Sequence, residues 1–208
     1  MPPAYVNTIR EEILYEYAKL ISRSAYRSLQ RGFVTDRFKK LRDGEISMSG
    51  TIREWEREQE LPKQCVFCGS TMDLTTDHLI PRRRGGDDSA DNVVLACQPC
   101  NASRGEKGIF EWLGLKEKDK VHRLVAGKYL KQILTLHEVA GTLEIAKDQI
   151  STLCERCPLP KVCEGWGKVR DLTCFCLESI LSYSKQEYLM TNEDVTLFVP
   201  RKWYVSPF

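Results

Sequence analysis

Two pairs of cysteines, each separated by two residues, are the strongest chemical signal in the sequence. Cys65 and Cys68 form the first pair, and Cys97 and Cys100 form the second. A two-residue spacer lets both thiolates of a pair converge on one ion, and two such pairs complete the tetrahedral four-sulfur set that zinc prefers. Because four protein ligands fill the coordination sphere, we expect this zinc to be structural rather than catalytic. The alternative interpretation is four free core thiols.

A second group of polar residues lies between and just after these pairs. Asp77 and His78 end a segment with strand character, Asn92 begins the next, and Asn101 directly follows the last cysteine of the second pair. A histidine titrates near neutral pH and is a natural general base for activating water. Carboxylate and amide oxygens suit a hard cation such as Mg²⁺ or Mn²⁺. The residue types therefore favour phosphodiester hydrolysis, which needs an activated water and charge stabilisation.

The combined spacing of these residues resembles the HNH endonuclease family. The resemblance covers residues 63–108, and it is carried by Cys65-Val-Phe-Cys68, Asp77-His78-Leu79-Ile80-Pro81, Gly85-Gly86, Asn92 and Cys97-Gln-Pro-Cys100-Asn101-Ala-Ser-Arg104-Gly105. It implies a fold of two strands and a helix around a catalytic metal, often with a four-cysteine zinc site. It also implies that His78 is the general base and that Asp77 and Asn101 bind a catalytic Mg²⁺ or Mn²⁺. Asn92 would be a structural member of the catalytic group that holds the His78 loop in place, although it could also be a simple turn residue.

Two features of this motif concern its metal and its geometry: the identity of Asn101 and the adjacent positions of Asp77 and His78 on one strand. Asn101 stands where many members of the family have histidine, although asparagine also occurs there, and the loss of an imidazole ligand favours Mg²⁺ or Mn²⁺. Asn101 could also act only as a helix N-cap. Adjacent residues on a flat strand point to opposite faces. We therefore expect a bend or bulge near Asp77 that lets Asp77 and His78 face one site.

Basic residues around the motif are candidates for contacts with nucleic acid. The only dense basic run in the chain is Arg82, Arg83 and Arg84. Such a run is often only a solvated loop, but this one follows the proposed catalytic strand directly. Arg104 lies three residues after Asn101 on the same helical face, where the family usually has lysine or arginine, consistent with a phosphate contact. Lys107 is a weaker candidate of the same kind.

The remaining five cysteines suggest a second metal site. Three of them follow the pattern C-x-x-C-P-x-x-x-x-C, which resembles part of several iron–sulfur modules. Cys174 or Cys176 could supply the fourth thiolate that an iron–sulfur cluster or a second zinc ion would need. A third interpretation is that no metal binds there. The expected ligands are Cys154, Cys157, Cys163 and Cys174.

The rest of the chain reads as helix, so the expected fold class is α+β and mostly helical, with a small zinc-stapled ββα-metal nuclease module flanked by helical segments. Apolar residues recur at helical spacing on both sides of the module. The expected parts are an N-terminal helical region at 1–62, the nuclease module at 63–108, a helical region at 109–150 and a cysteine-rich region at 151–208.

Local signals set the expected boundaries of the elements. Asn7 is a plausible N-cap of the first helix and Gly32 a plausible stop, and a second helix is expected at residues 33–41. A third helix is expected to start at Ser49 or Thr51 and to run up to Pro62. Strands are expected at residues 74–80 and 92–96, and a short helix after Cys100. Near the C-terminus we expect a helix at 177–188 and strand character at 195–204, limited by Pro200.

Composition narrows the classes of protein. The chain has 208 residues, nine cysteines and a formal net charge of +2, and 42% of its residues are hydrophobic. This hydrophobic share argues against general disorder. We expect no membrane span and no secretory signal, and therefore a cytoplasmic protein in which nine thiols favour metal binding over disulfides. The near-neutral charge excludes an overall basic field but not a local nucleic-acid site.

The sequence therefore predicts a metal-dependent HNH endonuclease that acts on DNA, with structural zinc, catalytic Mg²⁺ or Mn²⁺, and a second zinc or iron–sulfur centre as an option. Expected partners are DNA and, as an option, a second copy of the chain. The main alternative is a zinc-stabilised nucleic-acid-binding module without catalysis, which would not need Asp77, His78 and Asn101 together. A third hypothesis is a structural interaction protein with two metal sites.

Overall fold

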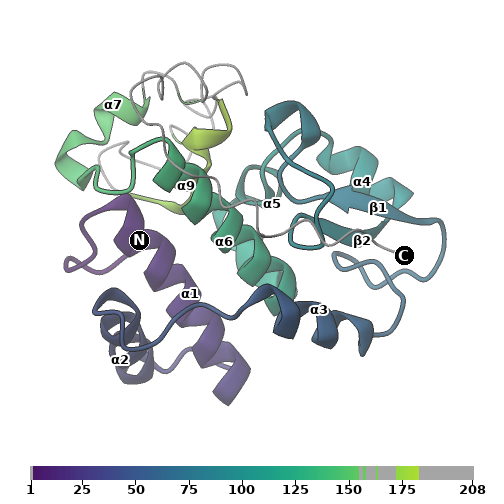
Figure 1. Ribbon diagram of the computed structural model, residues 1–208, viewed down its shortest axis with the longest axis horizontal. Helices are drawn as coiled ribbons and strands as arrows, with labels where there is room; N and C mark the ends of the chain where they lie inside the picture. The colour runs from purple at the N-terminus through teal and green to yellow at the C-terminus, as the bar shows by residue number, and fades with distance from the viewer. Residues whose placement is uncertain (1, 155–156, 158–162, 164–171, 183–208) are drawn as a thin grey trace.

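The computed structural model shows a two-stranded sheet set beside a group of helices, an α+β and mostly helical fold (Figure 1). The structure describes residues 2–154, 157, 163 and 172–182. The strand expected at 195–204 lies outside the described residues, as does the second half of the helix expected at 177–188. Among the described residues, no helix is both long enough and apolar enough to cross a membrane.

Three helices come first: α1 at Ile9–Tyr26, α2 at Arg31–Arg42 and α3 at Thr51–Gln59. Thr8 rather than Asn7 caps α1, because the Thr8 Oγ1 accepts a hydrogen bond from the Glu11 N–H at 3.2 Å. The helix ends at Arg27, which has a left-handed φ of 56°. Gly32 lies inside α2, so the expected stop at Gly32 is wrong.

The sheet consists of β1 at Leu74–His78 and β2 at Val93–Cys97, paired antiparallel. Helix α4 at Gln98–Arg104 follows β2 without a loop and packs against both strands. Both expected strands are present with shifted ends. The helix begins before Cys100 rather than after it, since Pro99 in its first turn suits a helix start.

The expected bulge near Asp77 is absent from β1. Asp77 pairs with Val94 and His78 pairs with Val93 in one unbroken register. The side chains of Asp77 and His78 therefore lie on opposite faces of the sheet. Asp77 is buried on the face that α4 covers, where it contacts Arg104.

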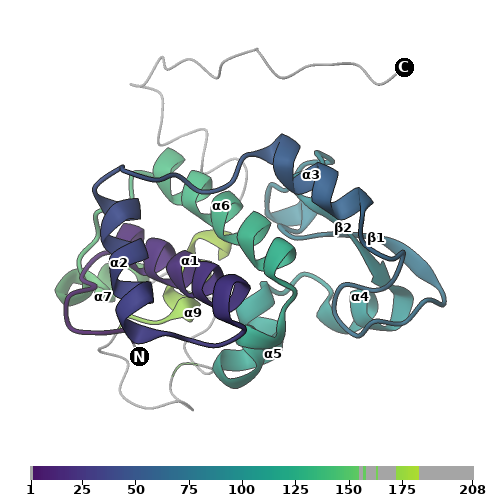
Figure 2. The ribbon, with the colours of Figure 1, turned by 90° about the horizontal axis from the view of Figure 1, so that it is seen from below.

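The second helical region contains α5 at Ile109–Glu117 and α6 at Arg123–Val139. Helix α6 lies between α1 and the sheet in both views (Figures 1 and 2). Shorter elements are η1 at Arg82–Arg84, η2 at Lys118–Lys120, η3 at Lys147–Gln149, α7 at Ser151–Cys154, α9 at Cys174–Leu177 and η4 at Glu178–Ser182.

A shared core joins the sheet unit to the helices. Ile13 of α1, Ile133 of α6 and the residues that follow β1, Leu79 and Ile80, belong to one buried apolar cluster. Lys128 of α6 adds a polar link. Its side chain is only 1% exposed, and its ammonium pairs with Glu58 of α3 and donates to the Ala90 carbonyl at 2.8 Å. The paired and hydrogen-bonded charge can be buried because its partners replace water.

Candidate functional site

The four cysteines of the two C-x-x-C pairs come together at one end of the sheet. All four sulfurs lie within 4.8 Å of one another, and the Cys68 and Cys97 sulfurs are 3.6 Å apart. Gly69 makes the first turn possible, because it has a φ of +77° and donates its N–H to the Cys65 carbonyl at 2.8 Å. Four converging thiols fit the tetrahedral coordination of zinc, so this cluster can bind one zinc ion.

The electrostatics of Cys65 suit a thiolate ligand. Burial opposes ionisation of its thiol, but hydrogen bonds from the backbone N–H groups of Cys97, Cys68 and Phe67 outweigh it and lower the pKa of Cys65 to about 6. Backbone donors that point at a sulfur stabilise its charged form, as they do for any buried anion.

Asp77 is held by an arginine. Arg104 donates its Nε hydrogen to the Asp77 Oδ2 at 2.9 Å and its Nη2 hydrogen to Oδ1. The side chain of Asp77 is 3% exposed and that of Arg104 is 1% exposed, so the ion pair is buried. The guanidinium also donates to the carbonyls of His78 and Leu79. Arg104 therefore fixes the end of β1 to α4.

Asn101 lies beside the same strand. Its side-chain Nδ2 donates to the Thr76 carbonyl at 3.2 Å. Asp77 and Asn101 have the oxygen chemistry that Mg²⁺ or Mn²⁺ prefers. In the structure, however, Arg104 donates to both carboxylate oxygens of Asp77, so a cation bound there would lie beside a positive charge already in place. A cation at Asp77 would therefore compete with Arg104 for this carboxylate.

His78 lies on the other face of the sheet, beside an acidic loop residue. Its Nε2 is 2.7 Å from the Asp88 Oδ1, and Arg82 donates its Nε hydrogen to the same oxygen at 3.0 Å. The His78 side chain is 16% exposed, so the ring is positioned but still open to solvent. Hydrogen bonds from His78 and then from Arg82 lower the pKa of Asp88.

The loop after His78 is tied down by Asn92. The Asn92 side chain is fully buried, accepts the Ile80 N–H at 2.7 Å, and donates to the carbonyls of Ile80 and Asp87 at 3.0 and 2.8 Å. Gly86 passes so close that an added Cβ would lie 1.8 Å from the Ile80 carbonyl oxygen. These contacts fix the loop that carries Asp88.

Comparison with known proteins shows that the segment with this geometry is similar to a known family. Residues 65–107 match the family model described as HNH endonuclease. This segment is an HNH domain. Over 70 residues the chain is 31% identical to the CRISPR-associated endonuclease Cas9 of Corynebacterium diphtheriae. The aligned segment covers 29% of this chain and 6% of that protein. The chain thus spans only a small part of that relative's length. No solved structure matches the chain.

The basic residues of the HNH domain differ in what they can reach. Arg82 is 66% exposed in its side chain and Arg83 is 83% exposed, and Arg83 pairs with Glu106 at 3.0 Å. Arg84 points inward and donates to the Leu181 carbonyl at 3.1 Å. Arg104 is buried against Asp77, whereas Lys107 is exposed. The structure thus presents Arg82, Arg83 and Lys107 to solvent.

Sequence reasoning missed Asp88 as a partner of His78. It read residues 81–88 only as a polar, turn-rich loop. The contact forms because η1 and the turn at Gly85, which has a φ of +91°, fold the loop back towards the end of β1. The signal that could have indicated this contact is Asp88 itself, a carboxylate that lies ten residues after His78 in a loop with two glycines.

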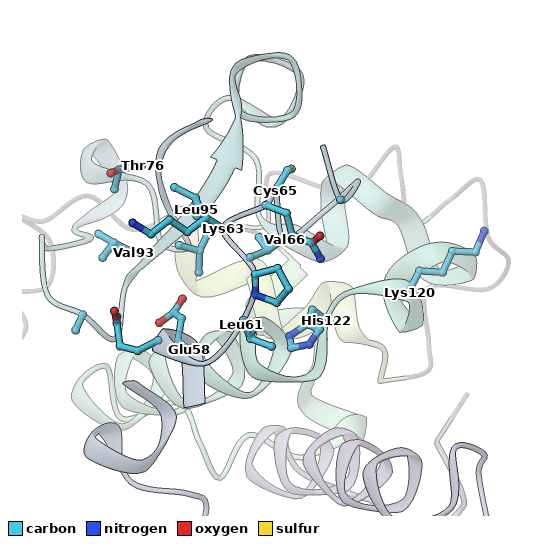
Figure 3. A pocket seen from close by; sticks show the side chains of 16 residues that line it. Glu58, Leu61, Lys63, Cys65, Val66, Thr76, Val93, Leu95, Lys120 and His122 are labelled. Atoms are coloured by element: carbon cyan, nitrogen blue, oxygen red, sulfur yellow. The ribbon is translucent and has the colours of Figure 1, made fainter. Parts of the chain in front are cut away.

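A cavity of about 580 Å³ lies between the HNH domain and the helices (Figure 3). Its lining includes Thr76 of β1, Val93 and Leu95 of β2, Glu58 of α3, and His122 just before α6. Burial and the charge of Arg123 lower the pKa of His122, and its Nδ1 is buried without a hydrogen-bond partner. His78 is not part of this lining, so the cavity and the candidate base are separate features.

The C-terminal cysteines do not gather as expected. Cys174 is 2% exposed, and its thiol lies 3.8 Å from the Glu12 carboxylate, within a tight group that also contains Glu16. We therefore correct the expected place of Cys174: its position in α9 turns its side chain towards α1. The other expected ligands, Cys154, Cys157 and Cys163, are half-buried.

Proposed function

We propose that this protein is an HNH endonuclease that hydrolyses phosphodiester bonds in DNA, with His78 as the general base. The match of residues 65–107 to the HNH family supports the reaction class. The single observation that carries the assignment of the base is the placement of His78, on the solvent-facing end of β1 and held by Asp88 at 2.7 Å. DNA as the substrate follows from the family resemblance.

The chemistry of His78 follows from its partner. Arg82 Nε lies 3.2 Å from the His78 Nε2 and 3.0 Å from the Asp88 Oδ1. Because a carboxylate only accepts hydrogen bonds, the shorter contact of Nε2 with Asp88 at 2.7 Å assigns the ring hydrogen to Nε2, and the Arg82 Nε hydrogen is then directed to Asp88. In that tautomer Nδ1 has the lone pair that can remove a proton from an attacking water. Asp88 keeps the ring in place and stabilises the imidazolium that forms. Asp88 is thus a positioning residue, and Arg82 in turn holds Asp88.

A divalent metal remains part of the proposal through Asp77 and Asn101. These residues would hold the ion, which would stabilise charge on the phosphate when bound. Because Asp77 is paired with Arg104, binding of the ion competes with a buried ion pair.

Contacts with the phosphate backbone are assigned to the exposed basic residues. Arg82 and Arg83 lie in η1, in the loop that carries Asp88, and Lys107 lies just after α4, near Glu106, with which Arg83 forms an ion pair. Arg104 has a different role in this proposal from the one that the sequence suggested, since it positions Asp77 instead of reaching outward. A small number of phosphate contacts predicts moderate salt dependence of binding.

Incubation of the full chain with supercoiled plasmid tests this proposal. Parallel reactions contain Mg²⁺, Mn²⁺ or no added divalent cation, and the zinc content of the protein is measured after each. Nicked or linear DNA that forms only with an added cation is the expected result, and linear product would favour paired copies of the chain. Tight DNA binding with no cleavage under any condition would instead support the non-catalytic nucleic-acid-binding module.

A further inference from the structure

The segment from the end of α1 to the end of α2 holds a local excess of basic residues. Residues 23–42 contain one acidic residue, Asp36, and seven basic residues, which are Arg23, Arg27, Arg31, Arg37, Lys39, Lys40 and Arg42. The whole chain has 31 basic and 29 acidic residues, so the rest of the chain is slightly acidic. The small net charge therefore conceals a positively charged region outside the HNH domain.

Helix α2 presents its charges outward. Its buried side chains are Val34, Phe38 and Leu41, which recur at helical spacing and pack towards α1. The basic residues of α2 all fall on the remaining arc of the helix. In both views α2 lies at the edge of the protein, on the side of α1 that faces away from the sheet (Figures 1 and 2). The basic surface is therefore separate from the HNH domain.

Ion pairs leave much of this charge without a partner. Asp36 is shared by Arg37 and Lys40, at 3.1 and 3.4 Å. Within the described part of the chain, the three exposed residues of the segment that form no ion pair are Arg27, Arg31 and Lys39. Their charges remain at the surface, where they attract anionic partners.

The stability of α2 does not explain all of these residues. Lys39, Lys40 and Arg42 lie in the last turn, where cations interact favourably with the negative end of the helix dipole. Arg31, however, begins the helix, where a cation opposes the positive end of the dipole, and the first turn contains no acidic residue. A positive charge at this position is better explained by an anionic partner than by the helix itself.

Aromatic contacts hold part of the basic surface in place. The Arg37 guanidinium lies 4.8 Å from the centre of the Phe33 ring. Tyr26, which is 53% exposed, packs edge-on against Phe33 with the two ring centres 5.0 Å apart. Stacking of this kind restricts the arginine side chain before any partner binds. A side chain that is already ordered loses less conformational entropy on binding.

We propose that residues 23–42 form a second DNA-binding surface, which contacts the phosphate backbone of duplex DNA apart from the HNH domain. The choice of DNA as the anionic partner rests on the proposed function. Duplex DNA carries one negative charge about every 1.7 Å along its axis, so several cations on one outer helix can each meet a phosphate. Such contacts carry no information about base sequence. The surface therefore raises affinity for DNA in general and does not select the site of cleavage.

Binding of the full chain to a fluorescently labelled DNA duplex tests this surface without any need for cleavage. Anisotropy titrations at several salt concentrations, with no divalent cation added, compare the wild type with a triple variant that carries Arg27→Gln, Arg31→Gln and Lys39→Gln. Loss of three phosphate contacts predicts about 10–100-fold weaker binding at low salt and a salt slope that is smaller by about 2–3. Wild-type affinity and slope in the triple variant would overturn the proposal, as would a wild-type protein that does not bind DNA.

A matched control separates this surface from net charge. The control variant carries Arg53→Gln, Arg123→Gln and Lys147→Gln, which remove three exposed basic residues elsewhere on the protein, and it should bind DNA nearly as the wild type does. Equal losses in both triple variants would overturn the proposal, because net charge alone would then explain them. Circular dichroism verifies folding. If the first triple variant does not fold, Lys39→Gln alone is used and should reduce the salt slope by about 1.

The result can be told apart from the outcome for the proposed function. Plasmid cleavage by the wild type together with unchanged DNA binding by the triple variant would refute the surface and leave the endonuclease assignment in place. DNA binding without cleavage, weakened in the triple variant, would support the surface alone. A wild-type dimer that dissociates in the triple variant, with DNA binding unchanged, would assign residues 23–42 to contacts with a second copy of the chain.

Discussion

Arg104 and Asp77 form a buried, two-bond ion pair that joins helix α4 to strand β1. The Arg104 Nε lies 2.9 Å from the Asp77 Oδ2, and the side chains are 1% and 3% exposed. The resemblance to HNH endonucleases gives these residues separate outward roles, as a phosphate contact and as a metal ligand. In the structure they neutralise each other, so metal binding by Asp77 would compete with its ion pair to Arg104.

Breaking this pair from one side should be costly. Arg104→Met leaves the Asp77 carboxylate buried without a counter-charge, and we expect the free energy of unfolding to fall by about 3–5 kcal/mol. Asp77→Asn should also destabilise, and the double variant should lose clearly less than the sum of the two. Urea unfolding of the four proteins measures this coupling. Additive losses would show that the two side chains do not depend on each other.

Gly86 should tolerate no side chain. An alanine Cβ there would meet the Ile80 carbonyl at 1.8 Å and the Asn92 amide at 2.7 Å, so Gly86→Ala must displace the loop that carries Asp88. We expect lower stability and slower DNA cleavage. Gly32→Ala is the matched control, because nothing lies within 4 Å of its added Cβ and the residue is inside α2. That control should be neutral or more stable by about 0.5–1 kcal/mol.

Removal of zinc from the HNH domain should unfold that domain locally. Zinc supplies about 10 kcal/mol or more of folding free energy in small zinc-binding units. Cys68→Ser should therefore make residues 63–108 sensitive to limited proteolysis, with cleavage sites mapped by mass spectrometry. The wild-type protein, digested in parallel, should resist cleavage there. Equal resistance of Cys68→Ser would mean that the core contacts of Leu79 and Ile80 hold this segment without metal.

Stability should depend on pH through Glu178. Burial raises its pKa from 4.5 to about 7, although hydrogen bonds from Tyr129, Phe110 and Glu111 act in the opposite direction. Between these pH values the unfolded carboxyl has lost its proton and the folded one has not, so the unfolded state binds fewer protons and stability falls as pH rises. Glu178→Gln removes this dependence.

The comparison of Glu178→Gln with the wild-type protein isolates this effect. The variant should gain stability relative to the wild type, by up to about 3 kcal/mol between about pH 5 and pH 8. The pKa of Glu12 is also raised, to about 8, mainly by burial. Its contribution is present in both proteins and cancels in the difference. A difference that stays constant with pH would show that Glu178 titrates normally.

The sequence predicted the cysteine cluster and the two strands of the HNH domain better than its side-chain contacts. The spacing of Cys65, Cys68, Cys97 and Cys100 was sufficient to predict their cluster, because a C-x-x-C turn has few conformations. Both strands were predicted from apolar runs. The alternation of side chains along a strand indicated that Asp77 and His78 could not face one site without a bend. The actual place of Asp77 depends on its ion pair with Arg104, a tertiary contact that has no local signal in the sequence.

Elsewhere the missing information was also tertiary. Cys174 and Cys176 are equivalent in the sequence pattern, and only the packing of α9 against α1 separates them. Asn7 and Thr8 are both good helix caps, and the observed cap depends on which side chain reaches the Glu11 N–H. Asp88 became a partner of His78 through the closure of a loop.

DNA cleavage by His78→Ala is the most direct test of the proposed function. The wild-type protein, His78→Ala and the control His122→Ala are compared on supercoiled plasmid with Mg²⁺ or Mn²⁺, after equal zinc content and circular dichroism have been verified. Loss of a general base predicts that His78→Ala cuts about 10²–10⁴-fold more slowly, while His122→Ala cuts like the wild type. Cleavage by His78→Ala at the wild-type rate would contradict the assignment of His78 as the catalytic base.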